Sequence, residues 1–268
     1  AAELRAGRAS RARPFAVFTL DDGYRDNLEH ALPVFRRHGC PFTVFVATAY
    51  AEGRGELWWE ILEQAIATQE VIRPEIEGLP AEIVTDTDED RTAAWNLLYP
   101  VVRWRMEEHA QRDWTRRFAE RHGIDTDALC RAMVMDWAAL AELTAGGLCT
   151  IGAHTVHHYA LARLTDEEEV LREMTESRER IAAELGGAVE TFAYPYGDAG
   201  SAATREFRLA AAAGFSCAVT TRKGLVPAAP DSLTALPRVS LNGLYQKLRY
   251  VDVMLTGAPF ALAGRLAG

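Results

Sequence analysis

The chain has 268 residues, of which 49% are hydrophobic and 25% are charged, and its formal net charge is -9. This balance is ordinary for one or two globular domains, and the acidic charge argues against a nucleic-acid partner, which would need a concentrated basic face. No apolar run approaches the roughly 18 residues of a membrane span, so we expect no transmembrane segment.

The first part of the chain has a strand, helix, strand order. "FAVFTL" (15–20) and "PFTVFVA" (41–47) are short continuous apolar runs, which indicate buried strands. Between them, "PVFRRHG" predicts a helical turn that begins at Pro33 and ends at Gly39. Continuous apolar strands separated by a helix indicate a parallel sheet.

Residues 50–148 change to a helical pattern. Apolar residues recur at helical spacing in "LWWEILEQAI" and in the series from Met106 to Phe118. Two interpretations stay open for the tryptophans of this segment: packing among helices, or a helical cap in which Trp58 and Trp59 contact a sugar ring. All six tryptophans lie here: Trp58, Trp59, Trp95, Trp104, Trp114 and Trp137.

The alternation of strands and helices resumes after residue 148. An amphipathic helix is predicted over 164–187, capped by Thr165 together with Glu168 and ended by Gly186 or Gly187. We interpret the chain, residues 1–268, as one α/β domain with a mainly helical insertion at about 50–148. The remaining predicted elements are strands at 149–154, 215–221 and 234–241, a strand that runs into a turn over 191–197, a helix at 201–214, and a packed terminal helix within the apolar tail 247–268, which could instead lie on a partner or membrane surface.

The cysteines and the opening residues are informative about the cellular location of the protein. Cys40, Cys130, Cys149 and Cys217 are scattered, with no C-x-x-C spacing, which is typical of reduced thiols in a cytosolic protein. No signal peptide is visible in the opening residues. We therefore expect a cytoplasmic location, unless a leader has been removed.

Two adjacent carboxylates, Asp21 and Asp22, follow the first predicted strand and precede Gly23. Asp-Gly is a common turn dipeptide, so a solvated turn is the simpler interpretation. The alternative is a catalytic pair, because parallel α/β folds place their reactive groups at the carboxyl ends of strands.

The segment "HTVHH" (154–158) follows a later strand. His154 and His158 are four residues apart, and on a helical turn this spacing puts both imidazoles on one face. With one carboxylate they would form a metal site that keeps positions open for water and substrate. One aspartate would then coordinate the cation while the other takes a proton from water whose pKa the cation lowers. We interpret His157 as a surface histidine.

The segment "YPYG" (194–197) follows another predicted strand. It can be a simple proline turn. It can also be a rigid loop beside a substrate, in which Pro195 and Tyr196 contact the substrate and the Tyr196 N–H faces an oxyanion.

The motifs "TLDDG", "HTVHH" and "FAYPYG", in this order, resemble those of the polysaccharide deacetylases, the NodB-homology group of carbohydrate esterase family 4. The spans "HALPVFRRHGCPFTVFVA" and "LPRVS" are similar too, so the resemblance covers about 15–50 and 135–245. It implies a distorted (β/α) barrel of about seven strands, with the helical segment as an insertion. It also implies metal-dependent removal of acetyl groups from an N-acetylated sugar, oligosaccharide or glycan precursor.

The resemblance also implies roles for individual residues. Asp21 takes the position of the catalytic base, and Asp22, His154 and His158 take those of the metal ligands. The metal is usually Zn²⁺, and Co²⁺ or Ni²⁺ could take its place. Tyr196 takes the position of the oxyanion N–H donor.

Two departures from the family pattern concern charge and proton transfer. Ala193 stands where the family often has an arginine that pairs with the catalytic aspartate, and Arg238 is our hypothesis for a replacement. The late L-x-H motif, whose histidine is the family's general acid, is missing, since no histidine of this chain follows His158. Either Asp21 returns the proton that it took, or a histidine of the insertion donates one: His109 or His122.

The missing acid keeps further functions open. An O-acetyl esterase would need less help from an acid than an enzyme that expels an amine. The chain could also be an amide hydrolase of the same fold with a different substrate, or a catalytically silent carbohydrate-binding protein that retains the tryptophan-rich insertion.

Overall fold

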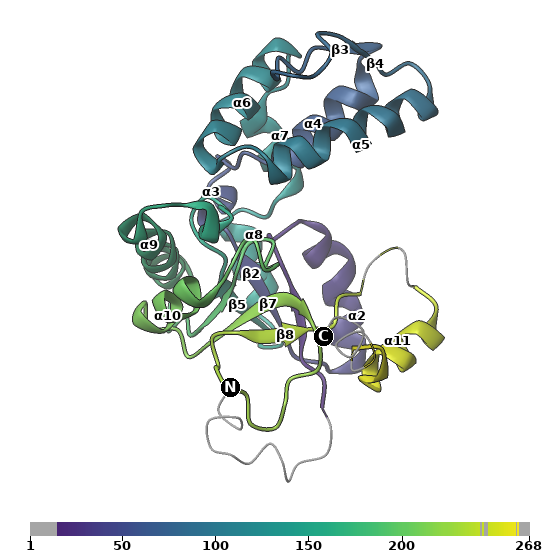
Figure 1. Ribbon diagram of the computed structural model, residues 1–268. Coiled ribbons are helices and arrows are strands. Elements are labelled where there is room, and N and C mark those ends of the chain that lie inside the picture. The colour runs from purple at the N-terminus through teal and green to yellow at the C-terminus, as the bar shows by residue number, and fades with distance from the viewer. Residues whose placement is uncertain (1–14, 242, 244–245, 261, 263–268) are drawn as a thin grey trace.

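A parallel sheet of six strands forms the base of the molecule, in the order β1-β2-β5-β6-β7-β8 (Figure 1). The computed structural model describes residues 15–241, 243, 246–260 and 262. The strands follow one another in chain order and every pairing is parallel, so their carboxyl ends lie along one edge. The strands are β1 (Phe18–Leu20), β2 (Phe42–Val46), β5 (Cys149–Ala153), β6 (Thr191–Ala193), β7 (Cys217–Lys223) and β8 (Leu236–Arg238).

The sheet is curled, so that its first and last strands approach each other. Arg238, the last residue of β8, donates from Nη1 to Thr19 Oγ1 in β1 at 3.2 Å, although these two strands do not pair within the described sheet. This half-barrel with helices confirms the expected α/β barrel class. The described sheet has six strands, where the resemblance implies about seven.

Strand β2 shows how the apolar runs specify the sheet. Its register pairs Phe42 with Cys149 in β5. The neighbouring residues Val44 and Phe45 point to opposite faces of the sheet, yet both are at most 2% exposed. The sheet is therefore covered on both faces, as continuous apolar strands predict.

Helices along the chain cover the sheet. Leu140 and Leu143 of α8 pack with Phe42 and Val44 of β2, and α9 packs its apolar face against β5 and α10. These helical elements are η2 (Asn27–Ala31), α2 (Leu32–His38), α3 (Thr48–Ala51), α8 (Trp137–Thr144), η3 (Leu161–Arg163), α9 (Glu167–Leu185) and α10 (Thr204–Ala212).

Two helices end at the glycines that the sequence predicts, whereas one helix begins at a different N-cap. Gly39, with φ 60°, ends α2, and Gly186 ends α9. Thr165 is not the N-cap of α9, contrary to expectation. The helix begins one residue later, because the Asp166 carboxylate accepts the Glu168 N–H at 2.9 Å; aspartate is at least as good an N-cap as threonine.

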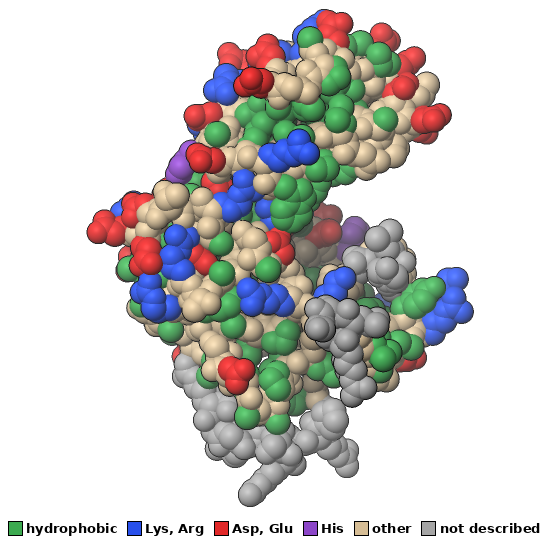
Figure 2. Space-filling view, in the orientation of Figure 1, with side chains coloured by type: hydrophobic (Ala, Val, Ile, Leu, Met, Phe, Trp, Pro, Cys, Tyr) green, Lys and Arg blue, Asp and Glu red, His purple; other side chains and the backbone are tan. Residues whose placement is uncertain are grey.

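The segment between α3 and α8 forms a lobe that projects from the sheet (Figures 1 and 2). It has a hydrophobic cluster of its own, which includes Trp58, Leu98, Trp114 and Phe118. Charged side chains of both signs cover its far end (Figure 2). Its elements are α4 (Trp58–Thr68), β3 (Val71–Ile72), β4 (Ile83–Val84), α5 (Asp88–Trp104), α6 (Glu108–Arg121) and α7 (Thr126–Met133). We call residues 57–133 the helical lobe.

The helix near the C-terminus is not packed as expected. α11 (Leu248–Leu255) has no buried residue among those described, and Leu248 is 80% exposed. The predicted packed terminal helix is therefore wrong for this part of the tail. The rest of that prediction, residues 261 and 263–268, lies outside the described residues. Within the described part of the chain, no helix combines the length and apolar character that crossing a membrane requires.

Candidate active site

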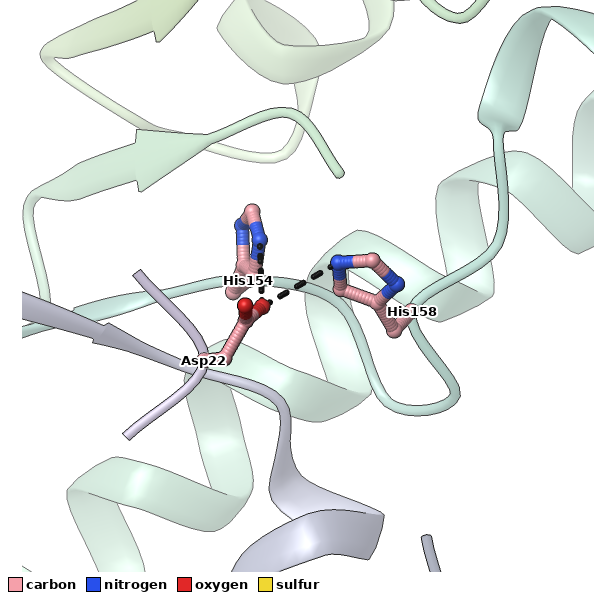
Figure 3. A group of neighbouring side chains, drawn as sticks. All are labelled: Asp22, His154 and His158. Atoms are coloured by element: carbon pink, nitrogen blue, oxygen red, sulfur yellow. Dashed lines mark ion pairs between the residues drawn. The ribbon is translucent and has the colours of Figure 1, made fainter. Parts of the chain in front are cut away.

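Three side chains from two strand ends converge on one point (Figure 3). Asp22 follows β1, and His154 and His158 follow β5. Asp22 Oδ1 lies 3.4 Å from His154 Nε2 and 3.2 Å from His158 Nε2. The three ligand atoms all lie within 4.8 Å of one another, so the predicted ligand set is brought together in space.

This cluster fits a small divalent cation. Two ligand atoms that are each about 2.1 Å from a tetrahedral Zn²⁺ are about 3.4 Å apart, which matches the spacing of Asp22 Oδ1 from the histidine nitrogens. Asp22 Oδ1 is buried and has no hydrogen-bond partner among the described residues. An ionised oxygen in this position is costly unless it is paired or coordinates a metal, and a cation between the three atoms would satisfy it.

His154 is oriented by a hydrogen bond on its other side. Its Nδ1 lies 2.7 Å from the Ala193 carbonyl oxygen, so Nδ1 carries the proton and donates it. The Nε2 lone pair is then directed toward Asp22, which is the arrangement of most metal-binding histidines. Ala193 lacks the arginine side chain of the family pattern, yet its backbone contributes to the site.

The two histidines converge through a loop and not through the helical turn that we expected. Thr155 and His158 have positive φ angles of 66° and 60°, and the His158 N–H donates to Thr155 Oγ1 at 2.8 Å. No helix spans these residues in the structure. The two imidazoles therefore converge as predicted, but through the conformation of a loop and not through the periodicity of a helix.

Glu173 of α9 holds the histidine loop from behind. One of its oxygens accepts the N–H groups of Val156 at 3.0 Å and His157 at 2.9 Å, and the other lies 2.5 Å from His157 Nδ1. The His157 ring is about half exposed, as expected for a surface residue, and its hydrogen bond to Glu173 raises its pKa. Glu173 was not predicted, although an acidic residue on the buried face of α9, beside Met174, is a signal that the sequence contains.

The electrostatics of the cluster favour a neutral His158 and an ionised Asp22. Burial lowers the pKa of His158 to about 4, in spite of the nearby Asp22 carboxylate. Burial also acts against ionised Asp22, but the close contacts of its carboxylate with His158 and His154 outweigh burial and hold the Asp22 pKa well below its usual range. For His154, burial acts to lower the pKa, but the contact with Asp22 together with the charges of Asp21 and Asp22 outweighs burial and raises the pKa.

Asp21 and Asp22 face different partners. Asp22 has φ 69°, and the Gly23 N–H donates back to the Asp21 carbonyl at 2.9 Å, so the chain turns tightly between them. Arg238 binds both Asp21 oxygens, with its Nη1 and Nη2 each donating at 2.7 Å. The repulsion between adjacent carboxylates is therefore relieved by a separate positive partner for Asp21. The structure brings Arg238 to the place that our hypothesis required.

The loop after β6 holds Tyr196 in a left-handed conformation, with φ 60°. Thr221 Oγ1 donates to the Tyr196 carbonyl at 2.6 Å. No described residue accepts a hydrogen bond from the Tyr196 N–H. A backbone donor of this kind is what an oxyanion site requires.

Two of the four predicted substrate contacts are excluded by burial. Trp58 is fully buried, and its indole N–H donates to the Tyr196 hydroxyl at 2.8 Å, so it packs inside the helical lobe and presents no face to a sugar. Pro195 is buried as well. Tyr196 and Trp59 are partly exposed, and the Trp59 ring lies 5.2 Å from the His158 ring.

A polar group beside Trp59 was not predicted. The Tyr24 hydroxyl donates to Glu60 Oε1 at 2.8 Å and accepts from Trp59 Nε1 at 2.8 Å. Tyr24 is two residues after Asp22, whereas Glu60 belongs to α4, so this group joins the helical lobe to the aspartate turn. Burial raises the pKa of Glu60. No short sequence pattern indicates a contact between residues 36 positions apart.

The two histidines of the insertion that were considered as proton donors, His109 and His122, have other hydrogen-bond or ion-pair partners. His122 Nδ1 lies 2.8 Å from the Phe118 carbonyl oxygen, and its Nε2 accepts the Arg73 N–H at 3.1 Å. His109 is exposed and pairs with Glu169 at 3.1 Å. Within the described part of the chain, neither ring has a contact with the aspartate pair or the histidine loop.

A family model described as "Polysaccharide deacetylase" matches residues 8–74 and 102–217. The search of curated proteins found no match.

Several solved structures share the fold. A Streptococcus pyogenes deacetylase, PplD, in complex with acetate is 16% identical over 94% of this chain and 76% of its own, with a TM-score of 0.56. A de-N-acetylase from Aggregatibacter actinomycetemcomitans is 10% identical over 94% and 79%, with a TM-score of 0.53. The deacetylase domain of BpsB from Bordetella bronchiseptica is 19% identical over 88% and 75%, with a TM-score of 0.50.

Proposed function

Because the chain belongs to the polysaccharide deacetylase family, we propose that it hydrolyses the N-acetyl group of a sugar, oligosaccharide or glycan precursor with a divalent metal at Asp22, His154 and His158. The observation that carries this proposal is the buried Asp22 oxygen, which has no hydrogen-bond partner among the described residues and lies 3.4 Å and 3.2 Å from two imidazole nitrogens. A structural ion pair would not need a second carboxylate next to it. Here Asp21 remains beside the cluster and is oriented by its own arginine.

The chemistry divides between the two aspartates and the Tyr196 loop. A divalent cation, when bound, lowers the pKa of water and polarises a carbonyl group; zinc suits this oxygen and nitrogen ligand set. Asp21 accepts the proton of the water that attacks the acetyl carbon. Each of its oxygens uses one lone pair on Arg238 and keeps another for this proton. The Tyr196 N–H stabilises the negative charge on the carbonyl oxygen.

The second proton transfer completes the reaction. The bond between the acetyl carbon and the sugar nitrogen breaks, and acetic acid and the free amine leave. The proton that Asp21 accepted goes to the leaving nitrogen. This route is supported by the contacts of His109 and His122, which among the described residues include neither Asp21 and Asp22 nor His154 and His158.

An O-acetyl ester is the second candidate substrate. It is favoured by the sequence observation that no histidine follows His158, because an alkoxide leaving group depends less than an amine on a separate acid. The cytoplasmic location expected from the cysteines remains part of the proposal.

Metal analysis combined with acetate release tests the proposal. We expect one divalent ion per chain, and acetate release from an N-acetylglucosamine oligomer that a chelator abolishes and Zn²⁺ restores. Substituting His158→Ala should remove the metal, whereas His157→Gln, one residue away and outside the cluster, should retain it. Release from O-acetylated sugars alone would select the esterase. Metal-independent release would contradict the proposed site, and sugar binding without any acetate release would favour a silent binding protein.

A further inference from the structure

The Tyr196 peptide is held between two parts of the molecule. From the sheet, the Thr221 N–H donates to the Gly197 carbonyl at 3.0 Å, and Thr221 Oγ1 donates to the Tyr196 carbonyl at 2.6 Å. A left-handed conformation at a tyrosine costs conformational energy, and it persists only where the surroundings over-determine it. The contacts from the sheet fix the backbone that follows Tyr196, whereas the Tyr196 ring is held by other residues.

Those partners come from the helical lobe. The guanidinium carbon of Arg103, in the last turn of α5, lies 3.7 Å from the centroid of the Tyr196 ring. Its Nη2 donates to Asp198 at 2.8 Å and to Ser201 Oγ at 2.7 Å. Trp58 adds a hydrogen bond to the Tyr196 hydroxyl. One arginine therefore reaches three residues of the loop that carries the oxyanion donor.

Arg103 is a costly residue for this position. Its side chain is 2% exposed, and a buried charge destabilises a protein unless it is paired and hydrogen-bonded. Its acidic partner, Asp198, lies on this loop, 95 positions away in the chain. A planar guanidinium can stack on a ring and donate hydrogen bonds at its edge at the same time, which a lysine ammonium cannot do.

We propose that Arg103 is a positioning residue that sets the direction of the Tyr196 N–H, so that the helical lobe controls the oxyanion site of the sheet. This inference rests on the proposed function, because it assumes that the Tyr196 N–H serves the reaction. It assigns the lobe a role in turnover that is separate from metal binding, since Arg103 has no contact with Asp22, His154 or His158 among those that the structure describes.

The alternative is that Arg103 only joins the lobe to the sheet. Both roles predict some loss of stability when Arg103 is replaced. They differ in turnover, because a displacement of about 1 Å at a reacting group can cost about 100-fold in rate, whereas a loosened but correctly folded interface leaves the rate per active molecule unchanged.

The test compares Arg103→Lys with Arg91→Lys in the metal-loaded full chain. Arg91 lies on the same helix, and its contacts with Thr85 and Asp88 stay within the lobe. For Arg103→Lys we expect kcat to fall about 10-fold to 100-fold, with KM within about threefold and metal content unchanged. For Arg91→Lys we expect all three to be unchanged. An Arg103→Lys enzyme whose kcat stays within about twofold of the native value would overturn the proposal.

A spectroscopic measurement follows the loop independently of turnover. In protein labelled with 5-fluorotryptophan, the ¹⁹F resonance of Trp58, assigned by its loss in Trp58→Phe, reports the hydrogen bond to Tyr196. We expect it to shift in Arg103→Lys and not in Arg91→Lys. An unmoved resonance in Arg103→Lys would contradict the positioning role, even if the native chain releases no acetate and the proposed function itself fails.

If Arg103→Lys does not fold, Asp198→Asn supplies the same test with a milder change. It removes the ionic partner and keeps the shape of the loop, so it should lower kcat in the same direction and shift the same resonance. A folded Asp198→Asn enzyme with native kcat and an unmoved resonance would overturn the proposal as well.

Discussion

Arg238 and Asp21 form a two-pronged ion pair, with each guanidinium nitrogen 2.7 Å from its own carboxylate oxygen. The arginine is fixed in turn by Thr220, whose carbonyl oxygen accepts its Nε–H at 2.9 Å. Pairs of this geometry give directional control as well as attraction. The orientation of the proposed base is therefore set by the last strand of the sheet.

Replacing Arg238 by lysine should impair turnover without affecting the metal. A lysine keeps the positive charge but cannot bind both Asp21 oxygens, so we expect kcat to fall about tenfold or more at unchanged metal content. Acetate-release kinetics and metal analysis measure the two effects. Arg249→Lys, in the exposed helix α11, is the control that should behave like the native protein. Loss of metal in Arg238→Lys would show that this arginine supports the ligand cluster instead.

Substitutions of the two aspartates should have different effects on turnover and on metal binding. Asp21→Asn removes the proposed base and should lower kcat by about 100-fold or more, while the metal stays bound. Asp22→Asn should lose the metal, because a neutral amide replaces the carboxylate that faces both histidines. Glu29→Gln, exposed in the same region, is the control for a simple change of charge. A fully active Asp21→Asn enzyme would show that another group takes the proton.

The pair between His157 and Glu173 predicts a specific pH dependence. The hydrogen bond to Glu173 raises the folded-state pKa of His157 above its ordinary value of 6.5. The stabilisation is therefore fully present below about pH 6.5 and is lost as the pH rises through the higher folded pKa. Urea unfolding should show His157→Gln to be destabilised most at acidic pH, by a modest amount, because the ring is half exposed.

The partner variant checks the origin of this effect. In a Glu173→Gln background, His157 has lost its acidic partner, so adding His157→Gln should no longer produce a pH-dependent difference. If the same dependence persists there, the cause lies elsewhere.

Gly197 should be far less tolerant of alanine than Gly39, although both have positive φ angles. A Cβ at Gly39 would meet nothing within 4 Å, so Gly39→Ala should cost only the conformational penalty of about 1 kcal/mol. A Cβ at Gly197 would lie 2.6 Å from the Thr221 nitrogen, which should add about 1–3 kcal/mol. Chemical denaturation of both variants measures the difference. Equal losses would mean that the Tyr196 loop can move away from β7.

The sequence predicts the parts of this molecule that depend on local pattern. Apolar runs locate the strands, and the ends of those strands carry Asp22, His154 and His158. In a parallel sheet, residues at strand ends meet at one edge, so their convergence follows from topology without knowledge of loop geometry.

Features that depend on long-range packing are the ones that the sequence does not show. The spacing of His154 and His158 predicted a helical turn, whereas the structure has a loop with two left-handed residues. Hydrogen bonds to Glu173 stabilise this loop. Packing among helices and contact with a sugar were both open for Trp58, and its depth is set by the packing of helices from across the lobe. A hydrophobic aromatic residue has the same local signature in a core as at a binding surface.

The contact between Arg238 and Asp21 joins residues 217 positions apart, and this affects when a newly made chain can become active. During synthesis on the ribosome, Asp22, His154 and His158 have all emerged long before β8. The ligand cluster can thus assemble on a nascent chain in which Asp21 has no arginine to orient it. We expect an incomplete chain to be able to capture metal while remaining inert toward acetyl groups, so that hydrolysis begins only after the last strand has joined the sheet.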